Sequence, residues 1–234
     1  MRALLLAAGR GERLRPLTDT VPKCMVPIDG RPLLDLWLEA LFAAGVERVL
    51  VNTSYLADVV EAHLAVSPWR ARIEIAREAS LLGTGGTVLA NRAFFGRQPF
   101  LVIHADNLSD LDIRGMIAAH AARAPGVAIT MAAFRTDRPR DSGILELDAR
   151  NLVTAFHEKV ANPPGDLANA AVYVFEPEVI DLIASYGRPV VDLSTQVIPR
   201  YIGRIQAYVH PGYHRDIGSP ESLAKARAEF PRRN

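Results

Sequence analysis

The first residues that could do chemistry form a loop rich in glycine and arginine. Gly9 and Gly11 follow an apolar run, and Arg13 and Arg15 come directly after them. Glycines let backbone N–H groups approach a phosphate or the edge of a base, and the arginines add positive charge beside them. The third glycine of the dinucleotide fingerprint is missing, because Leu14 takes its place, and no Gly-Lys-Ser/Thr phosphate loop is present. A nucleotide-binding loop and a tight turn with solvated arginines both remain open on this pattern.

A lysine with unusual neighbours follows this loop. Lys23 lies in the segment 21–27, which has prolines at positions 22 and 27. Because proline fixes the backbone angle φ, we expect Lys23 to stand on a stiff loop, and this favours a role in binding phosphate. The neighbouring Cys24 is the single cysteine of the chain, and we expect it to be a buried bystander rather than a nucleophile.

The elements that must position these residues alternate between strand and helix over the first 130 or so residues. Apolar runs predict strands at 3–7, 48–52, 73–75, 100–103 and 127–134. Helical spacing predicts helices from 32 to 45 and at 56–65, 84–95 and 112–124. This alternation predicts an α/β protein with a parallel, helix-covered sheet. In such sheets ligands bind outside the carboxyl ends of the strands.

The pattern changes after residue 135. Two short runs, 143–147 and 152–156, are separated by four polar or small residues and predict a hairpin. Further strands are expected at 170–175, 205–209 and 213–217, and helices at 177–186, 192–201 and 221–230. Neither a repeat of fixed period nor a long linker interrupts the chain, so we expect one domain over residues 1–234.

The early motif as a whole resembles the signature of the sugar-1-phosphate nucleotidylyltransferases, also called nucleotide-sugar pyrophosphorylases. That signature has the form L-x-x-G-x-G-x-R-L-x-P-L-T, followed by P-K-x-x-x-P, and residues 6–18 and 22–27 match it. The resemblance covers nearly the whole chain. It implies a Rossmann-like three-layer sandwich with a mostly parallel, mixed central sheet, a single nucleotidyltransferase catalytic domain over residues 1–234, and no C-terminal β-helix.

The resemblance also implies which residues bind the nucleotide and a metal. The segment 82–87 looks like the second glycine loop of the family, and Asp106 and Asp216 look like its two metal-binding aspartates, which would hold Mg²⁺. Ala105 stands where the family often has glycine. Arg13, Lys23 and Asp106 would be the catalytic residues. The implied nucleotide-binding residues are Ala7, Ala8, Gly9, Gly11, Arg13, Lys23, Gly83, Thr84 and Gly85.

On the sugar side, the resemblance assigns Glu158, Lys159 and Asn169 to the sugar phosphate. Val160 stands where a proline is common in the family, and Ala171 stands where a glycine is usual. Adjacent strand residues point to opposite faces, so Glu158 and Lys159 can reach one ligand only if the strand ends or twists there. We expect such an ending, because a Pro- and Gly-rich loop follows at 162–165.

The implied reaction transfers a nucleoside monophosphate from a nucleoside triphosphate to a sugar 1-phosphate and releases pyrophosphate. The glycine loop at 82–86 and the triplet at 158–160 most resemble guanylyltransferases acting on mannose- or heptose-type 1-phosphates. A uridylyltransferase acting on N-acetylmuramate 1-phosphate or a related sugar phosphate is the alternative within the family. A non-catalytic nucleotide-sugar sensor or regulatory subunit is the alternative of a different class, because a fold alone does not establish catalysis.

The composition limits the partners. The chain has 234 residues and a formal net charge of +1, which gives no global attraction to nucleic acid or to a membrane surface. Its apolar runs are shorter than the ~20 residues of a membrane span. A single cysteine allows no internal disulfide and fits a cytoplasmic protein. We expect a monomer or small homo-oligomer whose partners are the triphosphate and the sugar phosphate.

Overall fold

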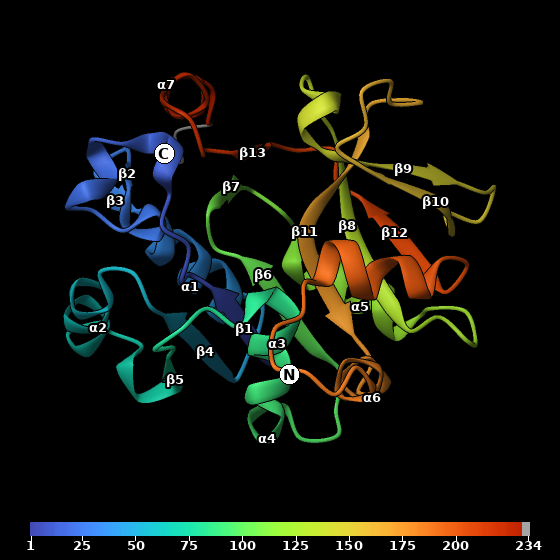
Figure 1. Ribbon diagram of the computed structural model, residues 1–234, viewed down its shortest axis with the longest axis horizontal. Helices are drawn as coiled ribbons and strands as arrows, with labels where there is room; N and C mark the ends of the chain where they lie inside the picture. Colours follow the sequence, from blue (N-terminus) through green and yellow to red (C-terminus); the bar gives the residue numbers. More distant parts are fainter. Residues whose placement is uncertain (231–234) are drawn as a thin grey trace. The chain divides into compact units, whose positions relative to one another are not determined.

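The computed structural model describes residues 1–230 of the chain (Figure 1). Contacts within the chain group the residues into two compact units. The first unit contains residues 1–81 and 103–111 and the chain from residue 213 onward, and the second contains 82–102 and 112–212. The expected single catalytic domain over residues 1–234 stays a prediction, and its last four residues lie outside the described part.

The first unit is built on parallel strands, as the alternation predicts. Strand β1 (Arg2–Leu6) pairs in parallel with β4 (Arg48–Thr53), and β4 pairs in parallel with β5 (Ile73–Arg77). The apolar run in β1 is buried, and so are nearly all residues of β4. Strands covered on both faces require such continuous apolar runs, which explains why both could be recognised in the sequence.

Helices and two small strand pairs complete the first unit. Helix α1 (Leu33–Ala43) buries leucines and Trp37 at helical spacing, and α2 (Ala57–Ala65) and α7 (Pro220–Glu229) are the other α-helices of this unit. Strand β2 (Pro27–Ile28) pairs with β3 (Arg31–Pro32), and β7 (Asn107–Ser109) pairs with β13 (His214–Asp216), both antiparallel. Short 3₁₀ helices lie at Glu12–Leu14, Leu17–Asp19, Lys23–Met25 and Arg70–Arg72.

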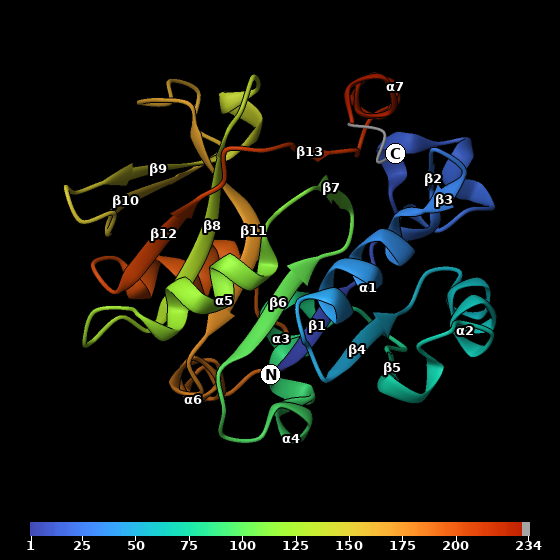
Figure 2. The same cartoon turned by 180° about the vertical axis from the view of Figure 1, so that it is seen from behind.

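The second unit contains a mixed sheet. Strand β8 (Ile129–Arg135) lies between β11 (Leu167–Phe175), which is antiparallel to it, and β12 (Ile205–Val209), which is parallel (Figure 2). The expected hairpin is confirmed as β9 (Gly143–Leu147) and β10 (Val153–Glu158), and β9 also contacts β11. Strand β6 (Phe100–His104) belongs to both units, because the boundary falls between Val102 and Ile103.

The helices of the second unit are α3 (Gly83–Ala90), α4 (Arg92–Phe95), α5 (Ile113–Ala121) and α6 (Glu178–Ser185). Helix α5 packs against β8 and β11. Aromatic rings fill the core: the rings of Phe95 and Phe100 stack with centroids 4.2 Å apart, and Phe100 meets Phe175 edge to face at 5.8 Å. Among the described residues, no helix combines the length and apolar character that a bilayer crossing requires.

Two expected helices differ from the structure. The helix expected at 84–95 is divided at Asn91, whose side-chain amide donates to the carbonyl of Thr87. The helix expected at 192–201 is a π-helical turn, Leu193–Val197, followed by a 3₁₀ turn, Ile198–Tyr201. Pro199 lacks a backbone N–H and cannot continue a regular ladder, so the apolar spacing alone overestimated the regularity of this segment.

Candidate active site

Four predicted site residues form one charged cluster in the first unit. The Lys23 ammonium donates to Asp106 Oδ2 and to Asp216 Oδ1, each at 2.8 Å. Arg13 Nη2 lies 3.1 Å from the other Asp216 oxygen. The Lys23 side chain is only 7% exposed, whereas the Asp106 side chain is 40% exposed and the Asp216 side chain 49% exposed. A buried ammonium is thus neutralised by two carboxylates that also face solvent.

Three contacts hold the two aspartates in place. The pairing of β13 with β7 sets Asp216 opposite Asn107, the residue that follows Asp106. The Trp37 indole in α1 donates to the Asn107 carbonyl at 2.8 Å. The Ser222 hydroxyl in α7 donates to the Asp216 carbonyl oxygen. Sequence analysis missed Trp37 and Ser222, because an apolar helix position and a serine in the first turn of a helix carry no signal of a neighbouring site.

Electrostatics keep this cluster ionised. Burial lowers the pKa of Lys23, but the charges of Asp106 and Asp216 and their hydrogen bonds outweigh it, so the pKa lies above its usual value. Desolvation by the surrounding protein raises the pKa of Asp106. The charges of Lys23 and then His104 together lower it by more, so the pKa lies below its usual value. The ammonium and this carboxylate are both charged at neutral pH.

The carboxylate pair fits a divalent cation only in part. One ammonium nitrogen contacts an oxygen of each aspartate, so the pair already places two carboxylates around a single cation. Among residues 1–230, however, no group of three or more His, Cys, Asp or Glu side chains could hold a metal ion. Mg²⁺ commonly takes one or two carboxylates and completes its shell with water and substrate phosphates. The two aspartates suit a Mg²⁺ ion that arrives with a phosphate ligand.

The structure explains why glycine is needed at only one of the two glycine positions of the first loop. Gly11 has a left-handed φ of 63°, and a Cβ there would lie 3.0 Å from Thr18 and 3.1 Å from the Lys23 stem. Gly9 would meet nothing within 4 Å. The fold therefore requires Gly11, whereas no packing contact in the structure explains Gly9.

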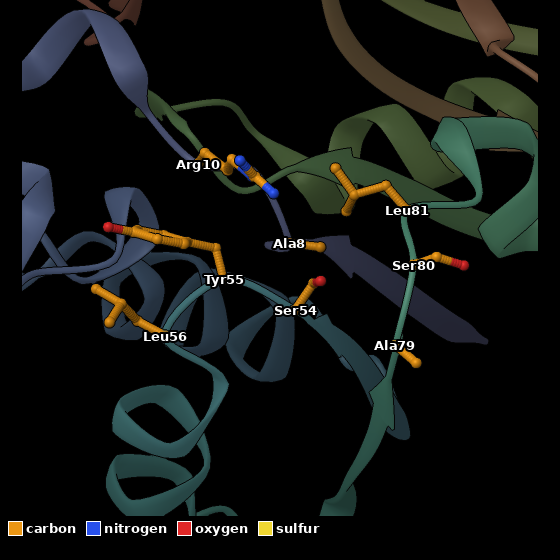
Figure 3. Close-up of a pocket in the computed structure, with 8 residues that line it drawn as sticks. All are labelled: Ala8, Arg10, Ser54, Tyr55, Leu56, Ala79, Ser80 and Leu81. Atoms are coloured by element: carbon orange, nitrogen blue, oxygen red, sulfur yellow. The ribbon is translucent and has the colours of Figure 1, made fainter.

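A cavity of about 270 Å³ opens at the carboxyl ends of β1, β4 and β5. Figure 3 shows that its walls come from three segments, one after each strand. The cavity thus lies at the carboxyl edge of the parallel strands, the position at which ligands commonly bind in such sheets. Of its lining residues, sequence analysis had named only Ala8; the full set is Ala8, Arg10, Ser54, Tyr55, Leu56, Ala79, Ser80 and Leu81.

A buried polar network lies next to this cavity. The Ala7 N–H donates to Asn52 Oδ1 at 2.7 Å, and Asn52 Nδ2 donates to Glu78 Oε1 at 3.0 Å. Asn52 and Glu78 are buried, so their hydrogen bonds fix the ends of the three strands relative to one another. The Ala7 N–H is committed to Asn52, so the predicted contact of Ala7 with a nucleotide would have to use its carbonyl or its Cβ.

The second glycine loop begins helix α3 in the second unit and packs against the segment 189–193. The N–H groups of Gly85 and Gly86 both donate to the Val191 carbonyl, at 2.8 and 3.1 Å. Gly83 has a φ of 72°, and a Cβ there would lie 2.5 Å from the same oxygen. The Thr84 hydroxyl donates to Asp192 Oδ2 at 3.2 Å. These glycines therefore have a packing reason that is independent of any ligand.

The predicted end of the strand at Glu158 is confirmed. Strand β10 ends at Glu158, and Lys159 has a left-handed φ of 50°. The turn brings Lys159 Nζ to 3.6 Å from Glu158 Oε1, so both charged groups lie on the same side. A Cβ on Gly143 of the paired strand would meet Glu158 Oε2 at 2.6 Å, so Gly143 leaves the space that Glu158 occupies.

Asn169 is aimed by an irregularity in β11. The register of β11 against β8 shifts between Asn169 and Tyr173, and Ala171 within it has a φ of 54°. The Ala171 N–H donates to Asn169 Oδ1 at 2.9 Å, and Asn169 Nδ2 donates to the Tyr173 hydroxyl at 2.7 Å. Such bulges bend a strand and redirect a side chain. The position where the related family usually has glycine is thus one that needs left-handed backbone.

The structure joins the predicted residues in part. Arg13, Lys23, Asp106 and Asp216 are in direct contact. Ala7, Ala8, Gly9 and Gly11 belong to the same unit, and Gly83, Thr84, Gly85, Glu158, Lys159 and Asn169 belong to the other.

The comparison with protein families decides the class. The model described as "Nucleotidyl transferase" matches residues 2–233. The chain belongs to the nucleotidyl transferase family. A mannose-1-phosphate guanylyltransferase of Mycobacterium tuberculosis is 36% identical over 98% of this chain and 64% of its own length. A mannose-1-phosphate guanylyltransferase catalytic subunit beta of Drosophila melanogaster is 30% identical over 95% of this chain and 60% of its own length. This nucleotidyl transferase thus spans less than two thirds of the length of these curated relatives.

Solved structures confirm the fold of this nucleotidyl transferase. A putative glucose-1-phosphate thymidylyltransferase from Bacillus anthracis superposes with a TM-score of 0.87 at 20% identity, covering 100% of this chain and 96% of its own. HddC from Yersinia pseudotuberculosis, solved in complex with GMP-PN, gives a TM-score of 0.81 at 27% identity and covers 98% and 99%. The expected α/β, Rossmann-like fold with a mostly parallel, mixed sheet is confirmed.

Proposed function

We propose that this nucleotidyl transferase moves a guanylyl group from GTP to a mannose- or heptose-type sugar 1-phosphate. The observation that carries the proposal is the Lys23 ammonium between Asp106 and Asp216, beside Arg13. It joins three distant parts of the chain into one cluster of two basic and two acidic side chains. The names of the relatives, mannose-1-phosphate guanylyltransferases, support the choice of base and sugar.

In the proposed reaction, a phosphate oxygen of the sugar 1-phosphate attacks the α-phosphorus of GTP. A new P–O bond forms, and the bond from the α-phosphorus to the oxygen that leads to the β-phosphorus breaks. Pyrophosphate leaves with that electron pair. Such transfers need little covalent help from the protein and depend on positioning and on neutralising charge. No side-chain nucleophile is required, and burial raises the pKa of the Cys24 thiol to about 12, which suits a bystander.

Lys23 and Arg13 would neutralise the negative charge of the triphosphate. Lys23 has a fixed position on its stiff turn, whereas the Arg13 side chain is 70% exposed and can turn toward a ligand. Asp106 and Asp216 would hold Mg²⁺. When bound there, Mg²⁺ would polarise the phosphate oxygens and stabilise the charge that develops on them.

We assign the base to the cavity after β1, β4 and β5. The Ser54 hydroxyl and backbone groups in its walls offer hydrogen bonds to the edge of a purine. In the second unit, Lys159 would bind the sugar phosphate. Glu158 would accept hydrogen bonds from sugar hydroxyls, and Asn169 would accept or donate hydrogen bonds with them. The proposed substrates are soluble phosphates, so we propose a cytoplasmic monomer or small homo-oligomer that needs no membrane or nucleic acid.

The test is a screen of pyrophosphate release. Four nucleoside triphosphates are each paired, with Mg²⁺, with mannose, heptose, glucose and N-acetylmuramate 1-phosphates. We expect release above background only with GTP, and only with the mannose- or heptose-type phosphate. Preference for UTP with N-acetylmuramate 1-phosphate would overturn the guanylyl assignment. If calorimetry shows that GTP binds but no substrate pair releases pyrophosphate, the protein would be a non-catalytic nucleotide-sugar sensor and not an enzyme.

A further inference from the structure

Tyr173 in β11 is a buried tyrosine with a hydroxyl at the centre of a polar network. Its side chain is completely buried, and its ring stacks on Phe175 with centroids 5.2 Å apart. Asn169 Nδ2 donates to the hydroxyl at 2.7 Å, and the Ser194 hydroxyl forms a second hydrogen bond with it. A buried phenol could be replaced by phenylalanine if packing were its only role, so these partners call for an explanation.

The direction of these hydrogen bonds follows from one backbone group. The Ala171 N–H can only donate, so the amide oxygen of Asn169 must face it. The amide nitrogen then faces Tyr173, whose oxygen accepts. The Tyr173 hydroxyl also forms a hydrogen bond with the Ser194 side chain. Among the described residues, these two hydrogen bonds use one N–H and one lone pair of the Asn169 amide, and the other N–H and lone pair are left for a ligand.

Ser194 continues the network toward the second glycine loop. Ser194 directly follows Asp192 and Leu193, and both of these residues contact Thr84. The Thr84 hydroxyl donates to Asp192 and accepts the Leu193 N–H at 2.7 Å. Asp192 also accepts the Thr195 N–H at 2.8 Å, which fixes the start of the turn. One short segment therefore contacts the glycine loop and the Tyr173 hydroxyl.

The surroundings keep the hydroxyl protonated. Burial raises the pKa of Tyr173, and the hydrogen bonds from Asn169 and Ser194 lower it by less; Glu158 and Asp192 raise it again. The resulting pKa lies well above its usual value, so the hydroxyl remains a donor throughout the physiological pH range.

We propose that Tyr173 is a positioning residue for the sugar phosphate. Its hydroxyl fixes the orientation of the Asn169 amide and ties it, through Ser194, to the segment that holds the glycine loop. Tyr173 is buried and acts through Asn169 rather than by touching the ligand. This inference rests on the proposed function, because it takes Asn169 to bind a sugar hydroxyl.

The first test replaces only the hydroxyl. Tyr173→Phe keeps the ring, and Tyr201→Phe is the matched control: Tyr201 is a buried tyrosine of the same unit whose hydroxyl donates to the Glu178 carbonyl, outside the network. We expect Tyr173→Phe to raise KM for mannose 1-phosphate by about 10-fold, the scale of one buried hydrogen bond, with KM for GTP within about 2-fold. Tyr201→Phe should leave both unchanged. Equal effects of the two variants would overturn the proposal.

A double-mutant cycle separates positioning from packing. If Tyr173 acts through Asn169, Tyr173→Phe should have no further effect on KM once Asn169 is alanine. Independent, multiplying losses would show that Tyr173 acts in another way. Ser194→Ala, which keeps the whole tyrosine, serves if Tyr173→Phe does not fold, and should raise the same KM by a smaller factor. An unchanged KM in Ser194→Ala would overturn the tie through Ser194.

A measurement without substrate distinguishes failure of this proposal from failure of the proposed function. In ¹⁵N-labelled protein, the side-chain amide protons of Asn169 should exchange with solvent several-fold faster in Tyr173→Phe than in the wild type or Tyr201→Phe. If the wild type turns over no substrate pair but this difference appears, the enzyme assignment fails and the positioning of Asn169 stands. If turnover is found but exchange is unchanged, Tyr173 does not hold Asn169.

Discussion

At the scale of single residues, Lys23 is the centre of the site. Its ammonium is buried, its loop is stiffened by prolines, and its charge is shared by two aspartates. Sequence reasoning found Lys23, Asp106 and Asp216 as separate motif residues. The resemblance implied that Asp106 and Asp216 meet at one Mg²⁺, but it did not predict that both contact Lys23, because neither spacing nor residue type shows which distant carboxylates neutralise a buried lysine.

Replacing Lys23 by alanine should lower kcat/KM by about 10²–10⁴, the scale of losing one preorganised electrostatic group. The measurement is steady-state pyrophosphate release with GTP and mannose 1-phosphate. Arg15→Ala is the control, since Arg15 lies in the same region but forms its ion pair, at 3.2 Å, with the half-exposed Asp19 and not with the Lys23 cluster. Near wild-type turnover of a folded Lys23→Ala protein would show that the ammonium does not serve the triphosphate.

Asp106 and Asp216 should behave as one metal site. Both contact the same ammonium nitrogen, so loss of either should disable the same cation-binding position. We expect the double Asp→Asn variant to lose little more activity than the worse single variant, because coupled groups are not additive. The measurement is kcat/KM for all three variants, with titration of Mg²⁺. Multiplying losses, or full wild-type activity in EDTA, would argue against a shared metal.

At the scale of elements, the first glycine loop separates a structural glycine from a functional one. Gly11→Ala should lower the free energy of unfolding by about 1–2 kcal/mol, because its φ of 63° is strained for alanine and its Cβ would crowd Lys23. Gly9→Ala should leave stability within about 0.5 kcal/mol, since its Cβ meets nothing within 4 Å. If the nucleotide lies along the loop, Gly9→Ala should nevertheless raise KM for GTP.

Urea unfolding and steady-state kinetics measure the two effects on the same protein samples. A stable Gly9→Ala variant with wild-type KM for GTP would remove Gly9 from the nucleotide-binding residues. A Gly11→Ala variant as stable as the wild type would mean that the loop adjusts without strain.

The bulge in β11 offers a stabilising substitution. Ala171 has a left-handed φ of 54°, which costs a residue with a Cβ about 1–2 kcal/mol. Ala171→Gly should remove this strain and raise the free energy of unfolding by up to about 1 kcal/mol, since the more flexible unfolded chain offsets part of the gain. Ala170→Gly, at the neighbouring buried position, is the control and should destabilise. The opposite order in urea denaturation would contradict the account of the bulge.

These elements also show where sequence reasoning succeeded. Buried parallel strands such as β1 and β4 need uninterrupted apolar runs, and the strand end at Glu158 followed from the need to place two adjacent charges on one side. The π-helical turn at 193–197 could not be predicted, since its apolar spacing fits a regular helix equally well. The cavity residues Ser54 and Tyr55 follow a strand but belong to no recognisable motif, so only the fold brought them to the site.

At the scale of the whole molecule, His120 is a buried source of pH-dependent stability in the second unit. His120 is buried; one ring nitrogen contacts Thr130 at 2.8 Å and the other contacts Glu176 at 3.1 Å, and Arg123 also pairs with Glu176. Burial and then Arg123 lower the pKa of His120, and Glu176 raises it by less, so the net pKa lies below the usual value. The folded protein therefore holds a neutral imidazole.

A histidine with a lowered pKa takes up protons in the unfolded chain before it does so in the folded protein. Its contribution to stability is thus fully present above the unfolded pKa of about 6.5 and is lost as the pH falls through the lower, folded value. We expect urea unfolding to show a smaller free energy at pH 5.5 than at pH 7.5, and a weaker pH dependence in His120→Gln. An identical pH dependence in the two proteins would mean that other groups govern acid stability.

The first unit is assembled from three separate stretches of the chain, and Lys23 and Asp216, which touch, are 193 positions apart. During translation, Lys23 and Asp106 therefore emerge from the ribosome long before Asp216 is synthesised. Nascent chains that stop short of residue 216 can bury the lysine against one aspartate only, so they cannot form the cation site however well their earlier strands fold. Folding of this unit must therefore wait for the segment that carries Asp216.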